Sequence, residues 1–124
     1  MRAIAIAVFG LPLIAPTATA VDYLCTFEKT FSCDSKSGCH AGTHIPDPIH
    51  VRVENQQISK RFCPKQKCDG DLVVGDGRVS PVGFIEFRDP GTIYTIDTTL
   101  EFSQVTLLPA YAELAFGTCK TLEE

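Results

Sequence analysis

The sequence predicts an all-β domain: a small antiparallel meander of about eight strands that closes as a β-barrel and is stapled by disulfides. Apolar and polar residues alternate along short segments, turn-forming residues separate those segments, and no long segment has the period of an amphipathic helix. The chain also has an even number of cysteines, which is typical of small disulfide-bonded domains. Because a meander has to protect its edge strands, closure into a barrel is favoured, and a two-sheet β-sandwich is the alternative.

The expected strands are short and follow one another along the chain. Residues 49–55 are the clearest, because the apolar Ile49, Val51 and Val53 alternate with polar side chains, as in a strand buried on one face. The other strands are expected at residues 22–29, 57–62, 71–74, 82–89, 92–97, 100–108 and 110–120. For a chain of this length a filled core is favoured over a ligand cavity. Alternation places four aromatic side chains in that core: Phe62, Phe87, Phe102 and Phe116.

Glycine, proline and aspartate mark the expected turns. Asp76-Gly77 predicts a tight hairpin, because both central positions tolerate a positive φ. Asp89-Pro90-Gly91 predicts a second turn. Residues 31–48 are rich in Gly, Ser, His, Asp and Pro, and we expect them to form the longest irregular segment.

Residues 1–20 have the features of a signal peptide: a basic residue, an apolar run too short to span a bilayer, and small residues before an expected cleavage site after Ala20. We therefore expect residues 21–124 to form a single β domain, with a loose C-terminal tail at residues 121–124. Such a protein is exported, to the periplasm or the extracellular space. No later segment is expected to cross a membrane.

The chain is acidic, with 15 Asp and Glu against 11 Lys and Arg and a net charge of −4. This balance excludes a general attraction to nucleic acid or to anionic lipid. The segment SKRFCPKQKC is a local exception. Its basic side chains form a candidate patch for an anionic partner: Lys60, Arg61, Lys65 and Lys67.

All six cysteines lie after the expected cleavage site, and in an exported domain we expect them to form disulfides. Closure of the meander would bring its first and last strands together, so Cys25 is expected to pair with Cys119. The remaining cysteines form two compact local pairs, Cys33 with Cys39 and Cys63 with Cys68.

The stretch Tyr23-Leu24-Cys25, the segments CDSKSGC and CPKQKCDGD, and the terminal AFGTCK resemble a loose class of small cysteine-containing exported bacterial proteins. The resemblance covers most of the chain after residue 20. It implies a cysteine-bearing first strand, a mid-chain cysteine pair followed by Asp, and a last strand that ends in Gly-x-Cys. The class has no assigned activity.

The Tyr-Leu-Cys opening and the late cysteine are also similar to the small periplasmic inhibitors of c-type lysozyme. This second resemblance implies a β-barrel that acts by binding a hydrolase. The central Ser-Gly-x-x-Tyr segment of those inhibitors has no counterpart in residues 79–87, and no inhibitory residue is carried over to this chain.

Cys33, Cys39, His40 and His44 have the side-chain types that bind zinc. Because disulfide formation removes both thiolates, no metal or other cofactor is expected, and a weak surface site for zinc or copper at the two histidines is the alternative. The chain has no G-x-S-x-G nucleophile elbow and no glycine-rich phosphate loop. No catalytic residue is therefore assigned, and the protein is not expected to be an enzyme.

The sequence thus predicts a non-catalytic envelope protein that acts as a binding or interaction module toward an unknown envelope or extracellular protein or ligand. Two alternatives stay open. One is a protein inhibitor of a lysozyme-type hydrolase, and the other is a carrier of a small ligand inside the barrel. The candidate interaction surface comprises His40, His44, Lys60, Arg61, Lys65 and Lys67.

Overall fold

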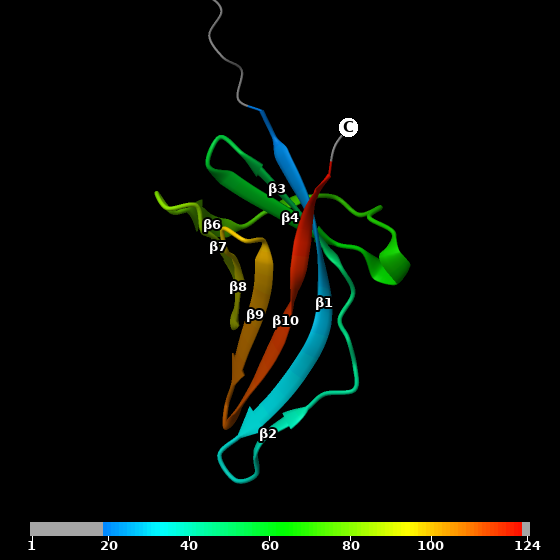
Figure 1. Ribbon diagram of the computed structural model, residues 1–124, viewed down its shortest axis with the longest axis vertical. Coiled ribbons are helices and arrows are strands. Elements are labelled where there is room, and N and C mark those ends of the chain that lie inside the picture. The colour runs from blue at the N-terminus through cyan, green and yellow to red at the C-terminus, as the bar shows by residue number, and fades with distance from the viewer. Residues whose placement is uncertain (1–18, 123–124) are drawn as a thin grey trace, which may run out of the picture.

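The computed structural model describes residues 19–122, which form one 10-stranded antiparallel sheet (Figure 1). Neighbouring strands follow the order β5-β4-β3-β1-β10-β9-β8-β7-β6, and β2 pairs with β1 off this path. The strands are β1 (Val21–Asp34), β2 (Gly38–Ala41), β3 (Ile49–Glu54), β4 (Gln57–Phe62), β5 (Val73–Val74), β6 (Asp76–Val79), β7 (Ile85–Asp89), β8 (Thr92–Ile96), β9 (Glu101–Leu108) and β10 (Tyr111–Leu122). The expected signal peptide lies outside the described residues, except for its last two positions.

The sheet closes into a nearly complete barrel through the segment that contains β5 and β6. Val73 and Val74 pair with β4, and the Gly75 amide donates a hydrogen bond to the Ile58 carbonyl (2.9 Å). β6 then pairs with β7 at the other end of the strand order. One bent segment thus joins the two ends of the sheet, and the predicted antiparallel barrel is confirmed. The sheet has more strands than the expected eight or so, because this segment forms two short strands where one was expected and because β2 is additional.

The predicted hairpin at Asp76-Gly77 is wrong. These residues begin β6, and Gly77 lies so close to β7 that a Cβ there would come within 2.7 Å of the Glu86 carbonyl oxygen. The chain reverses instead at residues 80–84, where the Gly83 amide donates to the Ser80 carbonyl (3.0 Å). Gly77 therefore serves the close approach of β6 and β7 and does not form a turn.

The segment at residues 31–48 is more regular than its composition predicts. β1 continues to Asp34 and pairs with β2, so that Cys33 lies directly opposite Cys39. By contrast, the turn at Pro90-Gly91 between β7 and β8 is confirmed, with Gly91 at a φ of 78°. Proline restricts its own φ to the value that the first central position of a tight turn needs, and glycine accepts the positive φ at the next position.

The C-terminal strand extends further than expected. Thr121 and Leu122 belong to β10, because they pair with Tyr23 and Asp22 of β1. The other two residues of the predicted loose tail, 123 and 124, lie outside the described residues. Within residues 19–122 the helical element is a short 3-10 turn, η2 (Pro64–Gln66), and no helix there is long and apolar enough to cross a membrane.

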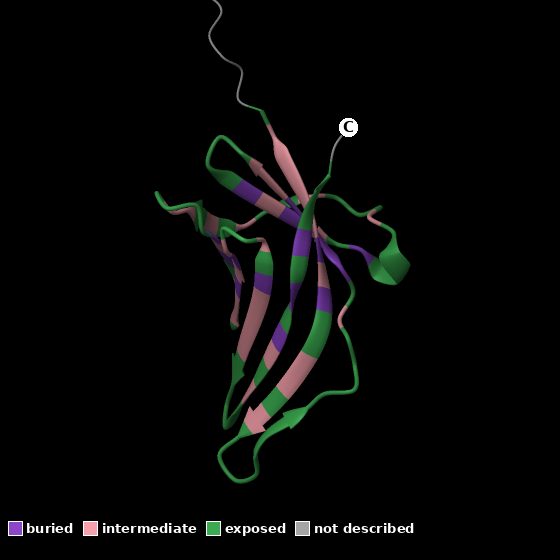
Figure 2. Ribbon diagram, viewed as in Figure 1, coloured by how far each residue is buried: buried purple, intermediate pink, exposed green. Residues whose placement is uncertain are grey.

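Side chains from most strands fill one half of the barrel. The ring centroids of Phe27 and Phe102 are 5.0 Å apart, and the Phe87 and Tyr94 rings stack at 4.7 Å. Figure 2 shows the buried residues gathered in the half of the molecule that contains β3 and β4, while the end that carries β2 is mostly exposed. Phe87 and Phe102 lie inside as predicted. The prediction is wrong for the other two phenylalanines, Phe62 and Phe116, which are exposed.

Three disulfides join the pairs that the sequence predicts: Cys25–Cys119, Cys33–Cys39 and Cys63–Cys68. Cys25 and Cys119 are buried and directly opposite each other in the register of β1 and β10. This bridge closes a loop with a sequence separation of 94, for which the chain-entropy model gives about 4–5 kcal/mol of stabilisation. The two local bridges close short loops and stabilise by about 2 kcal/mol each on the same basis.

Candidate interaction face

The polarity of the sheet inverts along β1, β10, β9 and β8. In the half that contains the core, inward side chains such as Phe27 and Phe102 are apolar, and outward ones such as Thr118 and Glu101 are polar. Further along the same strands the inward side chains are mostly polar and the outward ones mostly apolar. We call this second part the distal half. It comprises residues 29–34 of β1, 111–116 of β10, 103–108 of β9 and 92–95 of β8.

Apolar side chains form a continuous line on the outward side of the distal half. Four of them are direct neighbours in the register across four strands: Phe31, Leu114, Val105 and Ile93. Leu107 and Phe116 flank this line and are 61% and 37% exposed. The solvent face of an antiparallel sheet normally carries polar side chains, and a contiguous apolar patch is typical of an interaction site. We call these six side chains the distal outward face.

A β-bulge in β1 turns Phe31 to the outward side. Phe27 lies opposite Gly117 and Lys29 opposite Phe116, so Glu28 is an extra residue in β1. Because side chains alternate along a strand, one extra residue moves every later side chain to the opposite face. Gly117 permits the bulge, since a Cβ at this position would overlap the Thr26 carbonyl oxygen.

The inward side of the distal half is polar. The Thr92 and Thr106 hydroxyls lie 3.1 Å apart, and the Gln104 amide donates to the Thr106 hydroxyl (3.4 Å). The segment after β2 runs along this side, where the Thr30 hydroxyl donates to the His44 carbonyl (3.1 Å). Inward residues of the distal half therefore contribute hydrogen bonds, and of the core cluster only Tyr94 and Ala115 lie in this half.

A hollow of ≈ 570 Å³ lies on the outward side, where the distal half meets the rest of the barrel. Phe31 and Phe116 line it, with ring centroids 6.1 Å apart and ring planes at 65°. Its charged lining comprises three carboxylates and one ammonium group: Glu28, Asp97, Glu101 and Lys29. The hollow thus combines aromatic surface with an excess of negative charge.

Two of these carboxylates are held in place by hydrogen bonds. Asp97 Oδ1 accepts from the Thr99 hydroxyl (2.7 Å) and from the amides of Thr99 and Glu101 (2.9 Å each). The Thr99 hydroxyl, and after it the Glu101 amide, hold the pKa of Asp97 below its ordinary value of 3.8, so this carboxylate is ionised at neutral pH. Glu28 Oε2 accepts from the Thr118 hydroxyl across the strand pair (3.2 Å).

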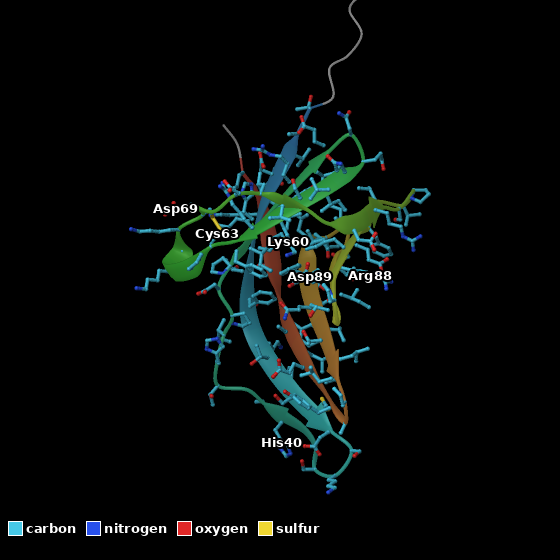
Figure 3. All side chains as sticks on the ribbon, turned by 180° about the vertical axis from the view of Figure 1, so that it is seen from behind. His40, Lys60, Cys63, Asp69, Arg88 and Asp89 are labelled. Carbon is cyan, nitrogen blue, oxygen red and sulfur yellow. A yellow bond between two sulfur atoms is a disulfide. The ribbon has the colours of Figure 1, made fainter. Side chains whose placement is uncertain are left out.

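The residues of the predicted interaction surface do not form one patch. His40 lies in β2 and His44 in the segment after it, and both are exposed. Figure 3 shows His40 at one end of the molecule and Lys60 near its middle. Lys65 and Lys67 are exposed in the loop that the Cys63–Cys68 bridge closes. The remaining two basic residues, Lys60 and Arg61, lie on opposite sides of β4.

Lys60 points into the barrel, where its side chain is 10% exposed and its Nζ lies 2.9 Å from Asp89 Oδ2. Figure 3 shows the two side chains next to each other. The Tyr94 hydroxyl donates to the same carboxylate oxygen (3.3 Å). Burial, and then the charge of Asp89, raise the pKa of Tyr94. Lys60 therefore stabilises the barrel interior and is not part of an exposed basic patch.

Arg61 belongs to a polar network that is not recognisable in the sequence. Its Nε donates to His50 Nδ1 (2.9 Å), so the ring proton of His50 lies on Nε2, which donates to Asp22 Oδ1 (2.8 Å). Arg52 Nε donates to the same oxygen (2.8 Å), and this bond is the main cause that lowers the pKa of Asp22. The sequence shows that His50 and Arg52 are polar residues in an alternating strand. Their hydrogen-bond partners depend on the register of β1, β3 and β4, which the sequence does not show.

The cysteines of the candidate zinc set are unavailable as thiolates, because Cys33 and Cys39 form a disulfide. Across residues 19–122, no three His, Cys, Asp or Glu side chains are grouped in a way that could hold a metal ion. The exposed His40 and His44 thus follow the Cys33–Cys39 disulfide in the chain.

Comparisons with known proteins identify no relative of this chain. No protein-family model, curated protein or solved structure matches the chain. The class that fold and surface define is a disulfide-stapled, barrel-like β domain with an apolar patch on its outward face.

Proposed function

We propose that the protein is an exported, non-catalytic interaction module and that it binds a partner protein through the distal outward face. The line Phe31, Leu114, Val105 and Ile93 carries this proposal, because these side chains are adjacent in the register and point away from the core. Burial of such a line by a partner removes apolar surface from water, which stabilises a complex by about 25 cal/mol per Å² before the costs of association.

Two further features support this proposal, one against catalysis and one against an internal ligand. Within residues 19–122, the histidine that is hydrogen-bonded to a carboxylate is His50, and both of its ring nitrogens are engaged. It is therefore not free to move a proton for a substrate. The aromatic stacking of Phe87, Tyr94 and Phe102 fills the half of the interior that contains the core, which favours an external contact surface over a carrier with a ligand enclosed there.

The inhibitor hypothesis is a special case of this proposal, since a protein inhibitor acts by binding. Its test is an inhibition assay with the purified protein in excess over a c-type lysozyme. Unchanged hydrolase activity would end that hypothesis and leave the wider proposal standing.

Two adjacent leucines provide a direct test of the face. Leu107 and Leu108 are 61% and 40% exposed and lie on opposite sides of β9. A photo-crosslinking amino acid is placed at either position, and the protein is exposed to extract of the cells that produce it. We expect a discrete adduct from position 107 that excess unmodified protein removes. Equal adducts from both positions, or none, would contradict the proposal.

A further inference from the structure

We infer that the hollow beside the distal outward face receives a lysine or arginine side chain of a basic partner protein. This inference rests on the proposed function and names the chemistry of the partner. The hollow adjoins the apolar line, since Phe31 belongs to both. A partner segment that covers the line therefore places a neighbouring side chain over the hollow.

The two aromatic rings that line the hollow suit the aliphatic stem of a basic side chain. The Phe31 and Phe116 rings meet edge to face, which leaves aromatic surface toward solvent. Lysine and arginine carry aliphatic stems that pack on apolar surface while the charged head remains near water or a counter-charge. A cation near an aromatic face also gains from the ring quadrupole.

The carboxylates that line the hollow suit the charged head. Glu28, Asp97 and Glu101 line the hollow, and Lys29 is the single basic residue in its lining. The hydrogen bonds to Asp97 and Glu28 fix two of these carboxylates before any partner arrives, which reduces the ordering cost of binding. A guanidinium group can donate to two carboxylate oxygens at once, so arginine is the better fit.

The same charges disfavour two other occupants. A second copy packed symmetrically on this patch would place the carboxylates against their own equivalents, because a two-fold interface joins identical surfaces. An anionic membrane would be repelled by the carboxylates and by the net charge of −4. A basic protein segment can cover the apolar line with apolar side chains and place a cation among the carboxylates of the hollow.

The test uses a small probe and the folded protein. ¹⁵N-labelled protein is titrated with Nα-acetyl-arginine amide and, in parallel, with the neutral isostere Nα-acetyl-citrulline amide. We expect chemical-shift changes around Glu28, Phe31, Glu101 and Phe116, with an affinity for the citrulline probe about five-fold weaker, as loss of one exposed ion pair predicts. Glu28→Gln and Glu101→Gln should each weaken arginine binding by a similar factor, and added salt should weaken it further.

Glu113→Gln is the matched control, because Glu113 is an exposed carboxylate of β10 on the inward side of the distal half. It should leave the arginine response unchanged. Equal responses to the two probes, responses unaffected by Glu28→Gln and Glu101→Gln, or no response at tens of millimolar overturn the inference. Dimerisation through this face, or co-sedimentation with phosphatidylglycerol vesicles, overturns it too.

The outcomes separate this inference from the proposed function. An adduct from position 107 without an arginine response keeps the interaction face and removes the basic partner. An arginine response without an adduct keeps the cation-binding hollow and removes the proposed protein contact.

Discussion

Phe31 lies directly opposite Leu114 in the register of β1 and β10, and both side chains point away from the barrel interior. Phe31 reaches this position only because the bulge at Glu28 changes the phase of β1. The pair continues across Val105 and Ile93 into an apolar line on the outward side. The sheet therefore has two apolar surfaces, the core of one half and the outward face of the other.

The two surfaces should differ in their effect on stability. Phe102 is 1% exposed within the core, and Phe102→Ala is expected to lower the free energy of unfolding by about 3–5 kcal/mol. Leu107→Ser on the distal outward face should change it by no more than about 0.5 kcal/mol. Urea denaturation followed by circular dichroism measures both. A large loss from Leu107→Ser would show that a packed layer covers this face.

The bulge depends on Gly117. Gly117→Ala places a Cβ against the Thr26 carbonyl oxygen and the Phe27 Cα, and it should destabilise the protein by about 1–3 kcal/mol. Gly70→Ala is the matched control, because no atom lies within 4 Å of a Cβ at that position. Thermal unfolding of the two variants decides the point. Equal melting temperatures would mean that β1 and β10 do not approach each other this closely.

The three disulfides should contribute unequally. Replacing Cys25 and Cys119 together by serine is expected to lower the free energy of unfolding by about 4–5 kcal/mol, because their bridge closes the longest loop. The same change at Cys33 and Cys39 should lower it by about 2 kcal/mol. Denaturant titrations of both double variants test this order, and the reverse order would contradict it.

Asp22 should make stability depend on pH in the acid range. Its folded-state pKa lies below 3.8, chiefly because Arg52 donates a hydrogen bond to it, so the folded protein binds this proton less readily than the unfolded chain. The stabilisation is complete above about pH 5 and is lost as the pH falls through the folded-state pKa. Asp22→Asn should therefore be less stable than the parent at pH 7, with a difference that narrows below about pH 4. A difference that stays constant down to pH 3 would contradict this assignment.

Much of the fold could be predicted because the strands obey a simple period. Ile49 and Val51 alternate with polar residues and lie in the core as expected. The pairing of Cys25 with Cys119 followed from barrel closure, since closure makes the first and last strands neighbours. Local alternation and topology together were enough for these features.

The candidate face could not be predicted, because it depends on register and on the bulge. Alternation placed Phe116 in the core, yet Phe116 is exposed on the outward side. The inward position is taken by the next residue, Gly117, where the backbone of β1 leaves no room for a side chain. Lys60 appeared to belong to a basic patch with its sequence neighbours. Its partner Asp89 lies on β7, and only the closed barrel brings the two together.

The cross-link at position 107, combined with changes elsewhere on the same face, tests the proposed contact surface most directly. Leu114→Ser and Val105→Thr remove apolar contact from the line without touching the core. We predict that the two changes together abolish the position-107 adduct, while the inward Glu113→Gln preserves it. An adduct of unchanged yield in the Leu114→Ser, Val105→Thr variant would contradict the claim that the distal outward face is the contact surface.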